Sequence, residues 1–505
     1  MTWRDYHEAT KHSVESLMRA RRVLDWANMP DPFRHYEGVP VLDLPADPPT
    51  PQIPALELLQ GVSGTSPVGD GPAFLSQLLF YSAAISASKR VPSTGDAYAL
   101  RVNPSSGNLH PTEFHFVTRG LTEWPDGVYH YDPSRHMAEQ RGRGTFETTM
   151  AACPASIVFI LTSIAWREAW KYGERAYRYC LLDMGHAWQA LALSARAIGC
   201  DAFAGGSFVD DEVTQLCRPS QDEWPMLMIR LRGESIPVRE AETRKTVWLG
   251  GLANPLSKET IAQPLIDTIH FATKLTSTES DRHPLSAEPT PTGSGVIALP
   301  PAASGTRSFG DVARTRRSAL DFMGGTQSIS LALLAAILRS GAERLSADFA
   351  STRFIRLYLY VHRVDGLRPG VYRFWAKCDE LEQVKIGDQR VAAAALSLGQ
   401  DLAGNACVAF SMVGDLEGAA GTYGDRGYRY VHFEAGAIGQ RLYLAAEALG
   451  LGATGIGAFY DDGVHRHLDL TPKEGQVVYH FAIGYPIPDP RISASKGRQE
   501  SVANS

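Results

Sequence analysis

A long internal repeat is the feature of this sequence that most limits its possible folds. Residues 171–179 read KYGERAYRY and residues 422–430 read TYGDRGYRY, at an offset of 251 residues. The offset continues without a gap to FVDD at 208–211 and FYDD at 459–462. The units of solenoid proteins repeat every 20–50 residues, roughly. A repeat at 251 residues is far longer and indicates a duplicated domain.

Each repeat predicts the same order of secondary structure. Two apolar strands are followed by a long helix without proline that ends at a glycine, then by a short strand and a final strand. The predicted elements of repeat 1 are strands 114–118 and 157–162, helix 177–198 and strands 201–204 and 226–231. Those of repeat 2 are strands 357–361 and 408–412, helix 428–449 and strands 453–456 and 477–483. This order predicts an α+β fold in which helices cover a sheet.

Two segments divide the chain. Residues 44–54 are proline-rich, and residues 276–306 are rich in Ser, Thr, Pro and Gly without a helical or strand period, so both indicate linkers. We predict an N-terminal helical and Pro-rich extension over 1–54, repeat 1 over 55–275, a linker over 276–306, repeat 2 over 307–490 and a loose polar tail over 491–505.

Composition excludes several classes of protein. The formal net charge of −6 gives no general attraction to nucleic acid or to an anionic membrane. No apolar run approaches the roughly 20 residues that span a bilayer, and the N-terminus lacks the apolar core of a secretory signal. The six cysteines form no CxxC pair, so we expect reduced thiols in a cytoplasmic protein. His465 and His467 have no third ligand nearby, and no metal site is predicted.

The segment Leu100–Glu113, LRVNPSSGNLHPTE, carries the strongest chemical signal. Its prolines, serines and glycine exclude a core helix or a central strand. The segment is either an ordinary turn or a cradle, in which hydroxyls, an Asn side chain and backbone N–H groups face a polar ligand.

The run PSSGNLHPTE, followed by GVYHYDP, closely resembles the SagB-type dehydrogenases of the FMN-dependent nitroreductase superfamily. YHEATKHS near the N-terminus, KYGERAYRY and RRSALDF at 316–322 are similar to the family as well, and the resemblance covers about residues 5–490. It implies a nitroreductase-like fold duplicated in one chain, which forms an intramolecular pseudo-dimer. It also implies an FMN-dependent oxidoreductase with the flavin bound between the two halves.

The resemblance assigns parts of the flavin site to both repeats. In the family, an Arg-Arg/His-Ser segment of one subunit contacts the ribityl-phosphate side of FMN, and the Pro-Ser-Ser-x-Asn loop of the other contacts the isoalloxazine ring. A glycine-rich loop after the long helix brings a backbone N–H near flavin N5. The residues implied here are Arg101, Pro104, Ser105, Ser106 and Asn108 of repeat 1 and Arg316, Arg317, Ser318, Gly457 and Ala458 of repeat 2, with Arg491 or Lys496 for the phosphate.

One family feature is missing near the flavin pyrimidine. Leu320 stands where relatives often carry a basic residue, and Arg101 is the candidate for the replacing charge.

The other interface has lost both motifs. Arg344–Thr352 of repeat 2, RLSADFAST, replaces the cradle, and Gln60–Ser63 of repeat 1 stands where repeat 2 has Arg316–Ser318. We therefore expect one FMN per chain.

Lys171 and Tyr172 precede the long helix of repeat 1, and repeat 2 has Thr422 and Tyr423 there. A Lys-Tyr pair at this place is implicated in catalysis in azoline-oxidising members of the family, and the resemblance implies the same role here. A lysine desolvated beside a flavin can act as a base, because burial disfavours its charged form. The alternative is a surface lysine beside a packed tyrosine.

Three functions stay open at this point. The first is a SagB-type dehydrogenase that oxidises an azoline ring of a peptide-derived substrate, with FMN and then oxygen as electron acceptors. The second is an NAD(P)H-dependent nitroreductase or quinone reductase, and the third is a non-catalytic flavin-binding partner protein. The cradle and the Lys-Tyr pair favour the first. We expect a small-molecule or peptide substrate and no nucleic acid or membrane partner, and oligomerisation beyond the pseudo-dimer stays open.

Overall fold

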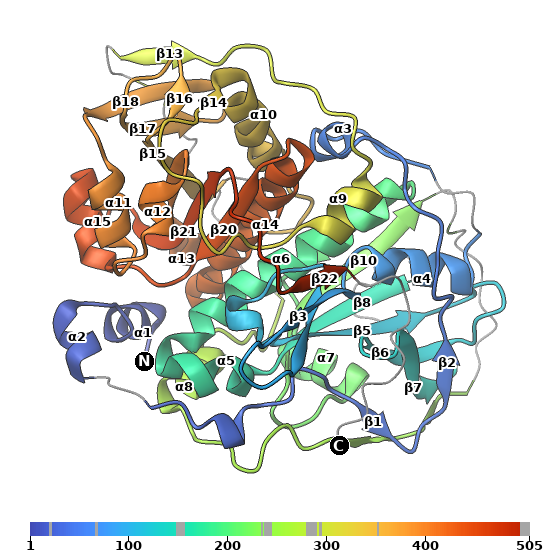
Figure 1. The fold of residues 1–505 in the computed structure, drawn as a ribbon. Coiled ribbons are helices and arrows are strands. Elements are labelled where there is room, and N and C mark those ends of the chain that lie inside the picture. Colours follow the sequence, from blue (N-terminus) through green and yellow to red (C-terminus); the bar gives the residue numbers. More distant parts are fainter. Residues whose placement is uncertain are drawn as a thin grey trace.

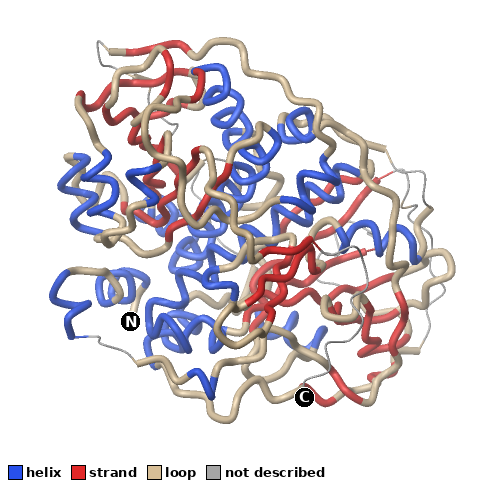
Figure 2. Tube along the Cα trace, in the orientation of Figure 1, coloured by secondary structure: helices blue, strands red, loops and turns tan. Residues whose placement is uncertain are grey.

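The computed structural model describes residues 1–19, 23–65, 69–147, 157–233, 236, 245–278, 290–291, 295–350 and 353–494. Two mixed halves lie side by side, repeat 1 at the lower right of Figure 1 and repeat 2 at the upper left. Two long helices, α6 (Ala176–Ala197) and α14 (Gly427–Ala448), lie between the two sheets (Figure 2). Part of the expected linker, together with Lys496, falls outside the described residues.

The two sheets have the same topology. The repeat 1 sheet runs in the order β11 (Val247–Trp248), β7 (Met137–Arg143), β6 (Gly127–Asp132), β5 (Thr112–Thr118), β8 (Ile157–Ser163), β10 (Trp224–Gly233), β9 (Cys200–Gly205). The repeat 2 sheet runs in the order β13 (Val296–Ala298), β18 (Glu380–Ile386), β17 (Gly370–Trp375), β15 (Ile355–Val361), β19 (Val408–Gly414), β21 (Gln476–Gly484), β20 (Gly452–Ile456). Neighbouring strands are antiparallel in both sheets. The expected α+β fold, duplicated in one chain, is confirmed.

The two long helices cross at a pair of equivalent glycines. A Cβ atom on Gly185 would lie 2.2 Å from the carbonyl oxygen of Phe433, and one on Gly436 would lie 2.0 Å from that of Leu182. Only glycine allows this approach of two helix backbones. Because Gly185 and Gly436 are related by the same 251-residue offset, the crossing marks a pseudo-two-fold axis between the repeats.

Two buried ion clusters join the repeats reciprocally. In each, one aspartate of one repeat pairs with two arginines at the start of the long helix of the other. The contacts are Arg426–Asp210 (2.9 Å), Arg429–Asp210 (3.1 Å), Arg175–Asp461 (3.0 Å) and Arg178–Asp461 (2.8 Å). Burial by itself raises the pKa of Asp461, but the two arginines outweigh it and bring this pKa down to about 2. Each aspartate is thus stable as an ion only while both repeats are in place.

Segments outside the expected repeat boundaries also belong to the fold. In the extension, α1 (Trp3–Ala9) packs on repeat 2, where Trp3 N–H donates to Asp425 (2.9 Å), and β2 (Val41–Asp43) pairs with β7. Strand β13 lies inside the expected linker and extends the repeat 2 sheet.

The expected loose tail begins with an ordered strand. β22 (Ile492–Ala494) pairs with β3 (Ile85–Arg90), which pairs with β4 (Ala97–Arg101) of repeat 1 (Figure 1). The end of repeat 2 is therefore bound to repeat 1.

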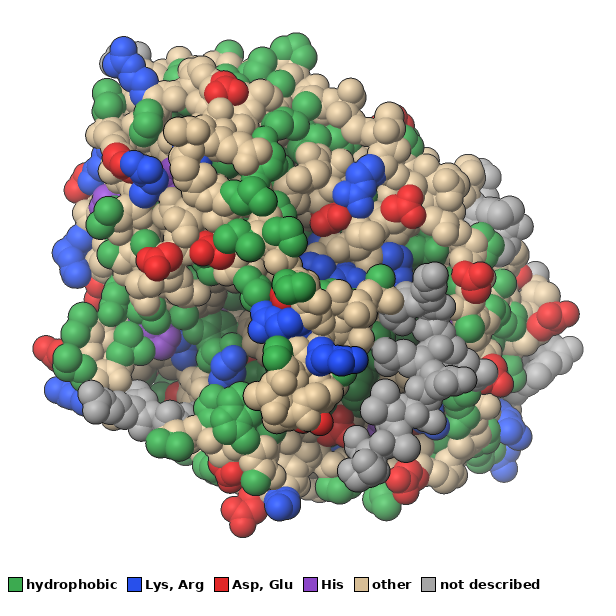
Figure 3. Space-filling view, viewed as in Figure 1, with side chains coloured by type: hydrophobic (Ala, Val, Ile, Leu, Met, Phe, Trp, Pro, Cys, Tyr) green, Lys and Arg blue, Asp and Glu red, His purple; other side chains and the backbone are tan. Residues whose placement is uncertain are grey.

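On the face shown in Figure 3, several basic side chains gather near the middle, and acidic and basic side chains are mixed over the rest. No helix in the described part of the chain combines the length and the apolar character needed to cross a membrane.

Candidate flavin site between the repeats

The cradle of repeat 1 is a turn between β4 and β5, and hydrogen bonds to helix α6 hold it in place. Ser106 donates to the Asp183 carboxylate of α6 through its backbone N–H (3.0 Å) and its hydroxyl (2.9 Å). The Ser105 hydroxyl accepts from the N–H of His110 (2.8 Å) and lies 3.5 Å from Glu168 Oε1. Both hydroxyls therefore point inward.

Asn108 also holds the turn. Its side-chain amide donates to the carbonyl of Ala99 (3.0 Å), and its side-chain oxygen lies 3.0 Å from His110 Nε2. The sequence predicted that the side chains of Ser105, Ser106 and Asn108 face a ligand. In the structure these side chains instead bond to the turn itself and to Asp183. They shape the turn, while Gly107 is its exposed residue and Pro104 is half-buried. The turn thus offers backbone rather than side chains to its surroundings.

Lys171 and Tyr172 end α5 (Ala165–Tyr172) directly against this turn. A Cβ atom on Gly107 would lie 2.7 Å from the Tyr172 hydroxyl oxygen and 3.1 Å from Lys171 Nζ. Burial, together with Glu168, raises the pKa of Tyr172, so its phenol stays protonated and able to donate. Lys171 is half-buried. The expected proximity of this pair to the cradle is present.

Arg316 brings repeat 2 to the cradle of repeat 1. It follows α9 (Phe309–Thr315), and its guanidinium donates to the carbonyls of Val102 (3.1 Å) and Arg101 (3.3 Å). Its Nη1 is buried and has no hydrogen-bond partner among the described residues. A buried cationic donor without an acceptor is costly, so this nitrogen fits an anionic or polar ligand.

Arginines gather at this point of the chain. Arg317 donates to the carbonyl of Ser86 (3.0 Å). Burial and the neighbouring Arg316 and Arg314 lower the pKa of Arg317 to about 10. An anion bound between these guanidinium groups would offset their repulsion, as a phosphate does in many arginine sites.

Ser318 and the glycine-rich end of β20 complete the repeat 2 side. The Tyr443 hydroxyl lies 2.9 Å from the Ser318 hydroxyl and accepts from the N–H of Gly455 (2.8 Å). A Cβ atom on Gly455 would lie 1.9 Å from the Tyr479 hydroxyl, and one on Gly457 would lie 2.4 Å from the ring of Tyr179. Close tyrosines therefore explain these glycines, where the sequence predicted room for a ligand ring.

The backbone N–H groups of Gly457 and Ala458 donate to no acceptor in the described ranges. Their counterparts in repeat 1, at the 251-residue offset, are Gly206 and Ser207. These donate to the two carboxylate oxygens of Asp348, at 2.9 and 3.0 Å. Among the described residues, these two N–H groups therefore lack an acceptor at the first interface and have one at the second.

At the second interface, the chain closes the equivalent place with its own backbone. Ala204 N–H donates to the carbonyl of Ser346 (2.9 Å), and Asp348 N–H donates to that of Ala204 (3.0 Å). The ring of Phe349 stacks on Tyr430 at 4.3 Å and 5°. This stretch lies within Arg344–Thr352, which the sequence identified as the lost cradle. A cavity of about 390 Å³ between Glu343, Arg353 and neighbouring residues remains beside it.

The structure moves the repeat 1 counterpart of Arg316–Ser318 by two residues from the place that the sequence predicted. The segments before α3 (Ala55–Leu59) and α9 pair symmetrically, through Ala55 N–H to Arg307 O (2.9 Å) and Phe309 N–H to Ile53 O (2.8 Å). This fixes an offset of 254, so Val62–Gly64 corresponds to Arg316–Ser318, where the sequence predicted Gln60–Ser63. No basic residue stands at either place.

Two expected cofactor residues point elsewhere. The Arg101 guanidinium lies 5.1 Å from the ring centroid of Phe33 and donates to the carbonyl of Pro32, so only its backbone meets Arg316. Arg491 precedes β22 and pairs with Asp489 at 2.7 Å. Its role at a phosphate stays a prediction.

Several residues at this interface were missed from the sequence. Most stand where the repeats differ at the 251-residue offset, and a position-by-position comparison would have found them. They are Glu168, His186, Tyr443 and Tyr479, opposite Ala419, Ala437, Ala192 and Met228. His186 Nε2 lies 3.0 Å from the Tyr479 hydroxyl, and Asn103 Oδ1 is buried without a partner among the described residues.

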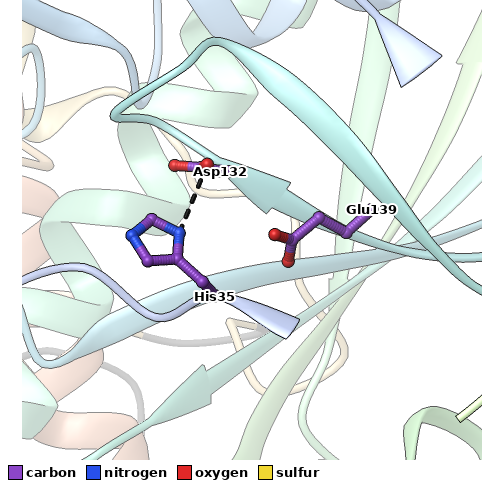
Figure 4. Close-up of side chains that lie close together, drawn as sticks. All are labelled: His35, Asp132 and Glu139. Carbon is purple, nitrogen blue, oxygen red and sulfur yellow. Dashed lines mark ion pairs between the residues drawn. The ribbon is translucent and has the colours of Figure 1, made fainter. Parts of the chain in front are cut away.

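A separate acidic cluster lies on β6 and β7, away from this interface. Figure 4 shows His35, Asp132 and Glu139, with His35 Nδ1 3.3 Å from Asp132. The Arg135 guanidinium pairs with both carboxylates, at 2.7 Å to Glu139. It supplies the positive charge that a metal ion would bring, and we assign the cluster no metal.

The nitroreductase family model matches residues 83–233 and 313–485, one copy in each repeat. The chain is similar to the crystal structure of a putative nitroreductase from Anabaena variabilis. The TM-score is 0.77 and the identity 27%, over 96% of this chain and 99% of that one. A putative nitroreductase of Methanocaldococcus jannaschii is 35% identical over 118 residues, 23% of this chain and 59% of that protein.

A trifolitoxin operon protein, TfxC of Rhizobium leguminosarum bv. trifolii, is 29% identical over 126 residues. The match covers 25% of this chain and 35% of that protein, so both curated relatives match over less than two thirds of their own length. The expected nitroreductase family is confirmed by matches in both repeats, and the finer resemblance to SagB-type dehydrogenases stays a prediction. The chain belongs to the nitroreductase family, with two nitroreductase domains in one polypeptide.

Proposed function

We propose that this nitroreductase-family oxidoreductase binds one FMN between its repeats and acts as a SagB-type dehydrogenase. One observation carries the proposal. Arg316 of repeat 2 donates to the carbonyls of Val102 and Arg101 in the cradle segment of repeat 1, and the N–H groups of Gly457 and Ala458 have no acceptor among the described residues, whereas Asp348 closes the equivalent place at the other interface. A site for one cofactor per chain follows from this difference.

The free donors at the first interface fit FMN in charge and position. The unpaired Nη1 of Arg316 and the crowded guanidinium of Arg317 suit the phosphate and ribityl oxygens. The N–H groups of Gly457 and Ala458 suit a ring nitrogen or carbonyl. Bound FMN supplies two-electron redox chemistry. The protein holds the cofactor and closes the other interface.

In this proposal Lys171 handles a proton. Its Nζ accepts the proton that leaves the substrate, and the Tyr172 hydroxyl donates a hydrogen bond to the substrate beside it. Both groups lie against Gly107, the exposed residue of the cradle. Thr422 replaces the lysine in repeat 2, at the closed interface, and this difference supports a role in chemistry rather than in folding.

A peptide-derived azoline is the proposed substrate. The Lys-Tyr pair at the cradle supports it, and so does the similarity to a protein named for the trifolitoxin operon, which favours a biosynthetic role. The second candidate is an NAD(P)H-dependent nitroreductase, because two relatives are named as putative nitroreductases.

An anaerobic reduction experiment separates the two. The purified protein with FMN would be mixed with azoline peptides and, separately, with NADH or NADPH, while flavin absorbance is followed. Bleaching by azoline peptides that is lost in Lys171→Ala supports the dehydrogenase. Rapid bleaching by NAD(P)H that does not depend on Lys171 would replace it by the reductase. Protein that binds no FMN would contradict both.

A further inference from the structure

Arg441 is a buried arginine of α14 that the proposed function does not use. It is 1% exposed. Its guanidinium donates to three neutral oxygens, those of the Gln189 side chain and of the Leu59 (3.4 Å) and Ser340 (3.3 Å) carbonyls, and to no carboxylate of the described residues. The two buried arginines at the start of the same helix differ, because each of them pairs with an aspartate. A buried guanidinium without a counter-ion is costly, so this place favours an anion.

A cavity of about 80 Å³ lies beside Arg441 at the second interface. Both repeats line it, with Arg196 from α6 and Ser346 and Arg441 from repeat 2. Ala192 lines it as well, and its counterpart at the 251-residue offset is Tyr443 of the candidate flavin site. One water molecule needs about 10–15 Å³ of such space. The cavity therefore has room for several waters or for one small oxyanion, but not for a flavin.

Positive charge dominates around this cavity. Arg196 and Arg441 line it, and Asp201 is the one acidic side chain among its described lining residues. Asp201 is exposed, so water and salt screen its charge. Burial, together with Arg196 and Arg353, lowers the pKa of Arg441 to about 9. Glu343 acts in the opposite direction. Arg441 thus stays charged at neutral pH in a place where its neighbours are mostly basic.

The two arginines that line the cavity are not a general feature of the repeated fold. At the 251-residue offset, Ala190 stands at the place of Arg441, and Glu447 stands at the place of Arg196. Glu447 pairs with Arg307 at 3.0 Å, so one long helix carries an acid where the other carries a base. The matched helices fold without this pair of charges. The difference supports a role in binding rather than in folding.

We propose that Arg441 and Arg196 bind a phosphate group at the second interface, either as free phosphate or as part of a small phosphorylated metabolite. Two guanidinium groups match the double negative charge and the several oxygens of a phosphate better than those of a single carboxylate. Ser346 supplies a neutral hydroxyl donor on the same cavity. Because the two arginines belong to different repeats, the bound phosphate bridges them. This site goes beyond the proposed function and does not depend on a flavin at the first interface.

Calorimetric titration with inorganic phosphate tests the site on the full chain, with and without saturating FMN and at constant ionic strength. With FMN present, one phosphate should bind per chain. Arg441→Met should weaken this binding about tenfold or more, because it removes a charge-assisted donor. Arg316→Ala should leave it unchanged. Binding that is lost in Arg316→Ala but kept in Arg441→Met would place the phosphate at the first interface and overturn the proposal, and so would a wild type that binds none.

Two further variants protect the test against a loss of folding. Arg196 is only half-buried, so Arg196→Gln should keep the circular dichroism spectrum and still weaken phosphate binding about tenfold or more. Arg390→Gln, which removes an exposed arginine that pairs with Asp388, should bind phosphate as the wild type does. Equal binding in the wild type, Arg196→Gln and Arg441→Met would overturn the proposal. Protein that binds no FMN would contradict the proposed function alone and leave these comparisons intact.

Chemical modification locates the phosphate on the chain. Phenylglyoxal reacts with arginine side chains, and mass spectrometry identifies the residues that it modifies. At a phosphate concentration about ten times Kd, modification of Arg196 should slow about tenfold, while that of Arg390 should not change. Glycerol phosphate, a small phosphoester, distinguishes the two sources. Tighter protection than by inorganic phosphate supports a phosphorylated metabolite, and equal or weaker protection supports free phosphate. Unprotected Arg196 with both probes would overturn the proposal.

Discussion

Asp348 accepts a hydrogen bond from the backbone N–H of Gly206 at 2.9 Å, at the second interface between the repeats. The equivalent N–H, that of Gly457, has no acceptor among the described residues. The repeats have the same fold but different residues at these two places. This asymmetry is the basis of the predictions below.

Flavin stoichiometry tests the asymmetry directly. The purified protein should be yellow, with about one FMN per chain by absorbance and protein assay. Asp348→Ala should leave this ratio unchanged, because the second interface still lacks a cradle and has Val62 and Ser63 at the places of Arg316 and Arg317. It should lower the thermal midpoint, since two backbone donors lose their acceptor at about 1–3 kcal/mol. Two flavins per chain at saturation would contradict the closed second interface.

Arg316→Ala should weaken FMN binding. The change removes a buried cationic donor at the site, and the loss should be about 1.5–3 kcal/mol, measured as FMN affinity by fluorescence titration. Ser63→Ala, at the repeat 1 counterpart of Arg317, is the control and should bind FMN as the wild type does. Equal weakening in both variants would mean that the flavin lies at the other interface.

Neither repeat alone should hold the flavin. A fragment of residues 1–275 contains the cradle but lacks Arg316–Ser318, and the remaining fragment lacks the cradle. Separately purified, each should be nearly colourless with added FMN, and mixing should restore binding. Stoichiometric FMN on residues 1–275 alone would disprove the shared site.

Acid should separate the repeats before it unfolds their cores. Asp461 has its pKa lowered to about 2 in the folded protein, from an ordinary value of 3.8. A lowered pKa gives stability that is present above the ordinary value and lost as pH falls through the folded one. The thermal midpoint should therefore drop between about pH 4 and 2. Asp461→Asn should remove the part of this dependence that comes from its own cluster, leave the part that comes from Asp210, and destabilise the protein by about 3–5 kcal/mol. A thermal midpoint that does not change with acid in either protein would contradict the role of the clusters.

Lys171→Ala should keep the fold and the flavin but lose turnover by about 10²–10⁴, the usual contribution of a positioned acid or base. Tyr172→Phe removes only the hydroxyl, so it separates hydrogen bonding from packing. Thr422→Ala, at the equivalent place in repeat 2, should be silent. Flavin bleaching by an azoline peptide is the measurement, and unchanged bleaching in Lys171→Ala would exclude the lysine from the reaction.

The elements that could be predicted from sequence are those with local signals. The predicted helices 177–198 and 428–449 differ from α6 and α14 by only one residue at each end. They could be predicted because an apolar run without proline that ends at a glycine is a signal within the segment itself. Contacts across long separations could not be predicted. Ser106 and Asp183 are 77 residues apart, so nothing in the cradle itself indicated that its hydroxyls turn inward. The strand β22 needed a partner some four hundred residues earlier.

The crossing of α6 and α14 at Gly185 and Gly436 places the two repeats as the two subunits of a homodimer would lie, and this bears on how the chain evolved. In a homodimer encoded by one gene, every substitution appears at both interfaces at once, and an aspartate like Asp348 would abolish both sites together. Once the two copies are one polypeptide, selection acts on each copy separately. The closed interface is thus a record of fusion. Under the proposed single flavin site, this interface was free to change only after the fused chain could keep the other one.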